Sequence, residues 1–260
     1  MSDSAQPTSL TVFAVGGPTA VLEFAGLRIL TDPSFDPPGD TPHGLHKLAG
    51  PALAPDDVLP IDLVLLSHDH HDDNLDTSGR AFLARAGRTL TTTAGAQRLG
   101  GNATGLEPWE SLEVGRPGGR TLTITAVPAQ HGPDGTDHLT GPVIGFVLTA
   151  PDVPTLYVSG DNASVDVVRT IADRVGPIEL AVLFAGGVSI PHRFDGAYLT
   201  LSADRAVEAA RALGARAIVP VHFEGWAHFT QGADDLRTAF ASAGLGDRLV
   251  VPEAGDTVQV

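Results

Sequence analysis

A short apolar run that ends in a cluster of histidines and aspartates is the most constraining feature of the sequence. Residues 63–66 read Leu-Val-Leu-Leu, a pattern typical of a buried strand, and residues 67–76 read Ser-His-Asp-His-His-Asp-Asp-Asn-Leu-Asp. In an extended backbone alternate side chains point the same way, so His68, His70 and Asp72 are expected to converge. Imidazole and carboxylate are ligands that zinc and related ions take. The cluster therefore indicates a metal site, the simpler alternative being a solvated polar loop.

Three other predicted strands also end at a histidine or an aspartate. These residues are His131, Asp161 and His222. Each alone has a simpler explanation: a histidine hydrogen-bonded at a strand end, an Asx turn before a helix, or a histidine packed in the core. Ligands in open α/β sheets bind at strand ends, so we expect all of them to share one edge with His68.

The residues can be divided between two ions. His68, His70 and His131 would hold one ion, Asp72 and His222 a second, and Asp161 would lie between them. Such ions lower the pKa of bound water and polarise the bond under attack, which suits hydrolysis of an ester, lactone, amide or phosphodiester. Asp69 and His71 are then expected to point away from the ligands.

Several residues are candidates for the catalytic steps. Asp72 and Asp161 are candidates at the metal-bound water. His192 and His228, because histidine is the commonest proton shuttle, and also Asp32 and Glu224 are candidates for proton donation or substrate contact. The alternative for each of these two histidines is an ordinary hydrogen-bonded loop residue.

Composition limits the partners of the chain. A net charge of −15 repels phosphate backbones and anionic lipid, so nucleic acid and membranes are poor partners and a small-molecule substrate is expected. There is no cysteine, no signal-peptide pattern at the N-terminus and no apolar stretch near the roughly 20 residues that span a bilayer, so a cytoplasmic protein is expected.

The organisation predicted from the sequence is a polar tail, residues 1–9, followed by one domain, residues 10–260. Residues 33–60 are rich in proline, glycine and aspartate without periodicity, which predicts a long loop near the site. Predicted helices include 74–86, 164–174, 202–213 and 233–243, and residues 249–251 are predicted to form the last strand.

The residues quoted above resemble a known family. The run His68-Asp69-His70-His71-Asp72-Asp73, followed by His131, Asp161 and His222, is similar to the HxHxDH motif and later ligands of the metallo-β-lactamase fold hydrolases. Residues 26–33 (Gly-Leu-Arg-Ile-Leu-Thr-Asp-Pro) and 219–222 (Val-Pro-Val-His) look like the subgroup of ascorbate-6-phosphate lactonases and N-acyl-phosphatidylethanolamine phospholipase D relatives. The resemblance covers roughly residues 10–255.

The resemblance implies a fold and a cofactor. The fold is an α/β, four-layer αβ/βα sandwich of two mixed β-sheets flanked by helices, with a centre of one or two zinc ions, or manganese. Asp73 stands where the family usually has a histidine. It is expected either to ligate weakly or to cap the helix that begins at Asn74, so one firmly held ion is expected, with the second ion loose or absent.

The resemblance further implies a metal-dependent hydrolase that uses a metal-bound hydroxide on an ester or lactone-type bond of a small molecule. The alternatives are a phosphodiesterase and a non-enzymatic metal-containing binding protein. Related proteins are often oligomers, so a homo-oligomer is compatible with the resemblance.

Overall fold

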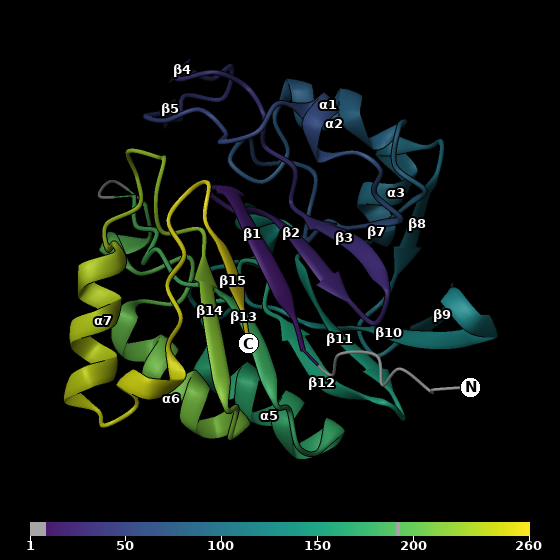
Figure 1. Ribbon diagram of the computed structural model, residues 1–260. Coiled ribbons are helices and arrows are strands. Elements are labelled where there is room, and N and C mark those ends of the chain that lie inside the picture. Colours follow the sequence, from purple (N-terminus) through teal and green to yellow (C-terminus); the bar gives the residue numbers. More distant parts are fainter. Residues whose placement is uncertain (1–8, 191–192) are drawn as a thin grey trace.

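The chain folds into four layers, with two mixed β-sheets in the middle and helices on both outer faces, as a computed structural model shows (Figure 1). The structure describes residues 9–190 and 193–260. The α/β sandwich expected from the sequence is confirmed. Among the described residues, no helix combines the length and the apolar character that crossing a bilayer requires.

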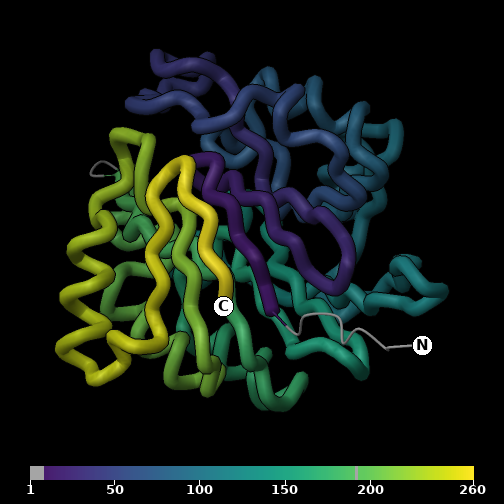
Figure 2. The backbone as a smooth tube through the Cα atoms, viewed as in Figure 1, coloured from purple at the N-terminus to yellow at the C-terminus, as the bar shows by residue number. Residues whose placement is uncertain are grey.

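The first sheet has seven strands in the order β15-β1-β2-β3-β6-β7-β8. Strands β15, β1, β2 and β3 pair antiparallel, whereas β3, β6, β7 and β8 pair parallel. Figure 2 shows the purple N-terminal strand beside the yellow C-terminal segment, which the pairing of β1 with β15 explains. The bounds are β1 Thr11–Gly16, β2 Thr19–Phe24, β3 Leu27–Thr31, β6 Leu63–Leu65, β7 Arg88–Thr92, β8 Ala103–Leu106 and β15 Thr257–Gln259.

The second sheet has six strands in the order β14-β13-β12-β11-β10-β9. Strands β9 to β12 form an antiparallel meander, and β12, β13 and β14 are parallel. The bounds are β9 Ser111–Arg116, β10 Arg120–Pro128, β11 Ile144–Ala150, β12 Val153–Val158, β13 Leu180–Phe184 and β14 Ala217–Val221.

Helices cover the outer face of each sheet. Two of them, α1 (Pro55–Val58) and α2 (Thr77–Leu83), pack on the first sheet, and α3 (Thr93–Leu99) contacts β7 and β8. The second sheet is covered by α5 (Val165–Val175), α6 (Ala203–Leu213) and α7 (Ala233–Ser242). A short helix, α4 (Asp137–Thr140), lies in the loop between β10 and β11. Three apolar cores result, one between the sheets and one under each helical layer.

Two local expectations differ from the structure. Helix α2 begins at Thr77 and is capped by Asp76, whose Oδ1 accepts a hydrogen bond from the Gly79 amide at 2.8 Å, so Asp73 does not cap it. Residues 249–251 are not a strand of the sheet; Leu249 forms an isolated bridge to Ile218, and the last strand is β15.

The predicted long loop carries a small hairpin. Residues 33–60 contain β4 (Gly39–Asp40), β5 (His46–Lys47) and α1. Figure 1 shows the β4–β5 hairpin at the top of the view, beyond the end of β1. The hairpin is hydrogen-bonded to residues 225–227, because Ala227 N donates to His46 O at 3.0 Å and Leu48 N donates to Gly225 O at 2.8 Å.

Candidate metal centre

The ligand candidates lie just beyond the ends of four strands. His68 follows β6, His131 follows β10, Asp161 follows β12 and His222 follows β14. All four side chains are at least 95 % buried. His222 adopts a positive φ of 60°, an uncommon conformation for a residue with a side chain. The common edge expected from the sequence is therefore present.

The donor atoms form two groups that share one carboxylate. The first group is His68, His71, His131 and Asp161, and the second is Asp73, Asp161 and His222, with the donor atoms of each group within 4.8 Å of one another. Asp161 Oδ2 lies 3.7 Å from Nδ1 of His131, the nitrogen that is also bound to the Leu199 carbonyl oxygen, and Oδ1 lies 3.6 Å from Nε2 of His222. Each carboxylate oxygen thus lies beside a histidine of a different group.

Hydrogen bonds fix which nitrogen of His68 faces the centre. Ser67 Oγ donates to Asp32 Oδ2 at 2.6 Å and therefore accepts from His68 Nδ1, 2.8 Å away. The proton is then on Nδ1, and Nε2 carries the free lone pair, 2.9 Å from Nδ1 of His71.

His131 is oriented in the same manner. Its Nδ1 donates to the carbonyl oxygen of Leu199 at 2.8 Å, because a carbonyl can only accept. Its Nε2 lone pair is therefore free. Asn74 Nδ2 donates to Asp161 Oδ1 at 3.2 Å and to Asp32 Oδ2 at 2.9 Å, so Asp32 connects the supports of His68 and Asp161.

Burial keeps the imidazoles of the first group neutral at pH 7. Burial, aided by the neighbouring histidines, lowers the pKa of His71 and of His131 to about 4. The same causes hold the pKa of His68 well below its usual value. Neutral imidazole is the form that binds a metal ion.

In the second group, contacts between carboxylates and imidazoles favour the charged forms of Asp73 and His222. Burial raises the pKa of Asp73, but the ring nitrogens of His222 and His228 outweigh burial and hold this pKa well below its usual range. Burial raises the pKa of Asp161. Against burial, the carboxylates of Asp161 and Asp73 raise the pKa of His222.

The residues present fit bound divalent ions. Both ring nitrogens of His222 and Nδ1 of His228 are buried without a hydrogen-bond partner among the described residues. A buried polar group without a partner costs about 1–3 kcal/mol, which ligation of a cation would offset. Neutral imidazoles beside buried carboxylates are the donor set of zinc and neighbouring ions.

The structure differs from the sequence-based expectation at His70 and His71. His70 Nε2 donates to the carbonyl oxygen of Thr140 at 2.6 Å, so His70 belongs to neither donor group although its ring centroid is 4.7 Å from that of His68. His71, expected to point away, belongs to the first group. The expectation assumed extended backbone, but the chain turns here, with Leu75 N donating to His71 O at 2.9 Å.

Asp72 and Asp73 differ from the expectation in the same way. Asp72 pairs with Nδ1 of His43 at 2.8 Å, outside both donor groups, whereas Asp73 joins His222 and Asp161. Asp73 Oδ2 lies 2.9 Å from His228 Nε2 and 3.4 Å from His222 Nε2.

Two further candidates complete the comparison. His228 contacts Asp73, so the structure places it beside the second group, whereas His192 lies outside the described residues. Sequence reasoning missed His71 as a donor candidate, and it missed Asp32, Ser67 and Asn74 as the supports of His68 and Asp161. The sequence also places His71 three residues after His68 and two residues before Asp73. This spacing could have indicated His71 as a donor candidate.

Asp32 provides a test of these supports. In Asp32→Asn, an amide nitrogen in place of Oδ2 would leave Ser67 Oγ free to donate to His68 Nδ1, which would move the His68 proton to Nε2, the nitrogen facing the centre. We expect metal affinity to fall about 10–100-fold, measured by chelator competition. Asp36→Asn is the matched control, because the Asp36 carboxylate accepts hydrogen bonds from the amides at the start of α2 and belongs to neither donor group. Unchanged affinity in Asp32→Asn would contradict the arrangement.

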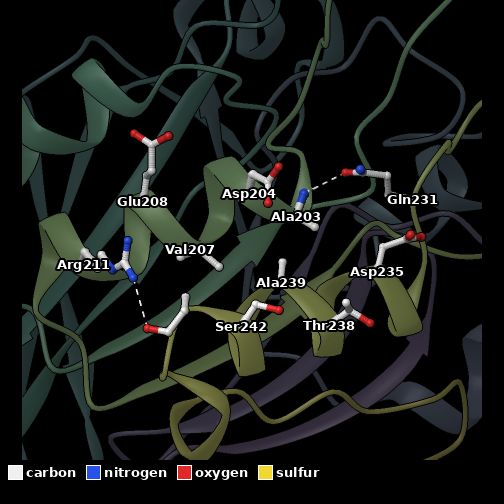
Figure 3. Close-up of a pocket in the computed structure, with 11 residues that line it drawn as sticks. Ala203, Asp204, Val207, Glu208, Arg211, Gln231, Asp235, Thr238, Ala239 and Ser242 are labelled. Carbon is white, nitrogen blue, oxygen red and sulfur yellow. Dashed lines mark hydrogen bonds between the residues drawn. The ribbon is translucent and has the colours of Figure 1, made fainter.

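A surface groove elsewhere does not contribute to this centre. Figure 3 shows it between α6 and α7, with Val207 and Arg211 on one side and Ala239 and Ser242 on the other. None of the metal-ligand candidates lines it.

Comparison with known proteins identifies the family. The family model described as the Beta-lactamase superfamily domain matches residues 27–223. A metal-dependent hydrolase of Methanosphaerula palustris is 30% identical over 199 residues, which cover 75% of this chain and 83% of that protein. An N-acyl-phosphatidylethanolamine-hydrolyzing phospholipase D of Caenorhabditis elegans is 26% identical over 237 residues, covering 85% of this chain and 65% of that protein.

A solved structure shares the fold. The isothiocyanate hydrolase from Delia radicum gut bacteria superposes with a TM-score of 0.80 at 23% identity, covering 95% of this chain and 98% of that one. The matched family segment includes His68, His131, Asp161 and His222. The chain therefore belongs to the metallo-β-lactamase superfamily and is one of its metal-dependent hydrolases.

Proposed function

We propose that the protein hydrolyses an ester or lactone-type bond of a small molecule at two metal ions. The first ion would be held by His68, His71, His131 and Asp161, and the second by Asp73, Asp161 and His222. The observation that carries this proposal is the position of Asp161, whose two oxygens lie beside histidines of different donor groups. Zinc is the proposed metal, with manganese as the alternative, because imidazole and carboxylate ligands suit both.

When bound, the ions would act as Lewis acids on the bond under attack and would lower the pKa of water in the site. The chain's own residues supply orientation. Asp32 and Ser67 hold the tautomer of His68, Leu199 O holds that of His131, and His228 holds Asp73 in place. In this arrangement His228 acts through Asp73.

Net charge favours a neutral substrate. A protein with a net charge of −15 would have to attract an anionic substrate through the metal ions alone, whereas a neutral ester or lactone meets no such repulsion. A phosphodiester is the second candidate, because the worm relative is named as a phospholipase D.

A substrate panel tests the proposal. We expect turnover of neutral lactones and p-nitrophenyl esters by protein loaded with zinc or manganese, and slower or no turnover of bis(p-nitrophenyl) phosphate. Chelator should abolish the activity and metal should restore it. Turnover of the phosphodiester alone would reverse the ranking of the two substrate classes.

A further inference from the structure

The two donor groups differ in the chemistry of their atoms. The first group offers three imidazole nitrogens and one carboxylate oxygen, from His68, His71, His131 and Asp161. The second group offers two carboxylate oxygens and one imidazole nitrogen, from Asp73, Asp161 and His222. His228 lies 2.9 Å from Asp73 Oδ2 but is not one of these donors. Nitrogen donors thus predominate in the first group and oxygen donors in the second.

The number of donors differs as well. The first group has four donors and the second has three, among the residues that the structure describes. Four ligands complete the tetrahedral set that zinc takes in proteins. Ions that prefer oxygen, such as manganese, take about six ligands, mostly oxygen atoms. An ion at the second group therefore has to find further ligands beside the three donors.

An amide in contact with the second group has an unused oxygen. Asn74 is fully buried, and its Nδ2 donates to Asp161 Oδ1 at 3.2 Å and to Asp32 Oδ2 at 2.9 Å. Both acceptors are carboxylate oxygens, so the amide presents its nitrogen to them. Its Oδ1 has no hydrogen-bond partner within residues 9–190 and 193–260. Because Asp161 Oδ1 is the oxygen that lies 3.6 Å from His222 Nε2, this amide contacts the second group.

Unsatisfied buried atoms distinguish the second group from an ordinary cluster of acidic residues. His222 is fully buried, and neither of its ring nitrogens has a hydrogen-bond partner in the described parts of the chain. Asn74 Oδ1 is in the same situation. Buried polar atoms in proteins are nearly always paired, so a nitrogen and an oxygen left unpaired beside two carboxylates point to a cation. Three of the four atom types gathered here are oxygens of carboxylate or amide groups.

We propose that the two groups take different ions, zinc at the first group and manganese, or an ion of similar preference for oxygen, at the second. This proposal rests on the two-ion centre of the proposed function and specifies the ion at each group. Imidazole suits zinc, whereas carboxylate and carbonyl oxygens suit manganese. Because zinc generally binds more tightly than manganese at any one site, the second group is expected to have a smaller preference for zinc, and manganese occupies it when manganese is in excess.

Displacement of manganese by zinc measures the preference of each group. Protein loaded with two equivalents of Mn²⁺ is titrated with buffered zinc, and the released Mn²⁺ is measured by the electron paramagnetic resonance signal of the aqueous ion. We expect two phases of one equivalent each, the second at a free zinc concentration at least about tenfold higher. Release of both equivalents in one phase would overturn the proposal and leave the two-ion centre intact. Binding of a single equivalent would overturn both.

Asp73→His tests whether the oxygen donors cause the difference. The variant replaces one carboxylate of the second group by an imidazole, so zinc should displace the second manganese at a free concentration closer to that of the first phase. Asp72→His is the matched control, because Asp72 is the adjacent residue and lies outside both groups. It should keep both phases at their wild-type positions. Two unchanged phases in Asp73→His would contradict the assigned cause.

Crystals of wild-type protein locate each ion without any substitution. They are grown at a ratio of free manganese to free zinc that lies between the two phases of the titration. Anomalous maps should then show a peak beside His131 that disappears below the zinc absorption edge and a peak beside Asp73 that persists as manganese. The same element at both positions, or the reverse order, would overturn the proposal. No substrate enters these measurements, so a failure of ester or lactone hydrolysis leaves their outcome unaffected.

Discussion

Replacing Asp161 by alanine is expected to remove both metal ions and nearly all activity. Among residues 9–190 and 193–260, Asp161 is the one residue that belongs to both donor groups, and each of its oxygens lies beside a histidine of a different group. Loss of a residue that only supports a ligand typically costs 10–100-fold in affinity or activity, so loss of a shared ligand should lower kcat/KM by more than about 100-fold. Metal content by elemental analysis and hydrolysis of the best substrate in the panel are the two measurements.

Asp166→Ala is the control for Asp161→Ala. Asp166 lies five residues later, in the first turn of α5, and its side chain is 88% exposed, so its loss should change neither metal content nor rate. Circular dichroism would show that both variants keep the fold. An Asp161→Ala protein that retains two ions and full activity would contradict the shared-carboxylate arrangement.

Replacing His71 by alanine is expected to have a much larger effect than replacing its neighbour His70. The first donor group contains His71, whereas His70 is bound to the carbonyl oxygen of Thr140. His71→Ala should lose the ion of the first group and more than about 100-fold in kcat/KM. His70→Ala should keep its metal and lose about 1–3 kcal/mol of unfolding free energy, because the buried carbonyl is left without its donor.

The pair of variants is its own control, since the two histidines are adjacent and chemically identical. Metal titration and denaturant unfolding of both proteins give the required comparison. The reverse pattern, with metal lost in His70→Ala and kept in His71→Ala, would restore the assignment expected from alternating side chains.

The strand-end residues could be predicted because their positions depend on sheet topology. His68, His131, Asp161 and His222 each follow an apolar strand, and parallel and antiparallel pairing brings these ends to one edge. The register within residues 68–73 could not be predicted, because alternation applies only to extended backbone. The chain turns after His68, and hydrogen bonds such as that of His70 to Thr140, 70 residues away, decide which side chains face inward.

The layered fold was predictable for similar reasons, and its C-terminal strand was not. The apolar residues Leu249 and Val251 pack against the core under α5, α6 and α7 rather than joining the sheet. The actual strand β15 contains a single apolar residue, Val258, and is defined by pairing with β1 at the other end of the chain. A segment of this length is too short to show the alternation of apolar and polar residues from which a strand is predicted.

An anomalous-scattering map of crystals grown with zinc, and separately with manganese, tests the central claim most directly. The account predicts two peaks on either side of Asp161, one contacted by His68, His71 and His131 and the other by Asp73 and His222. It also predicts that Asp72 remains on His43. A peak contacted by His70 or Asp72 in place of His71 or Asp73 would contradict it.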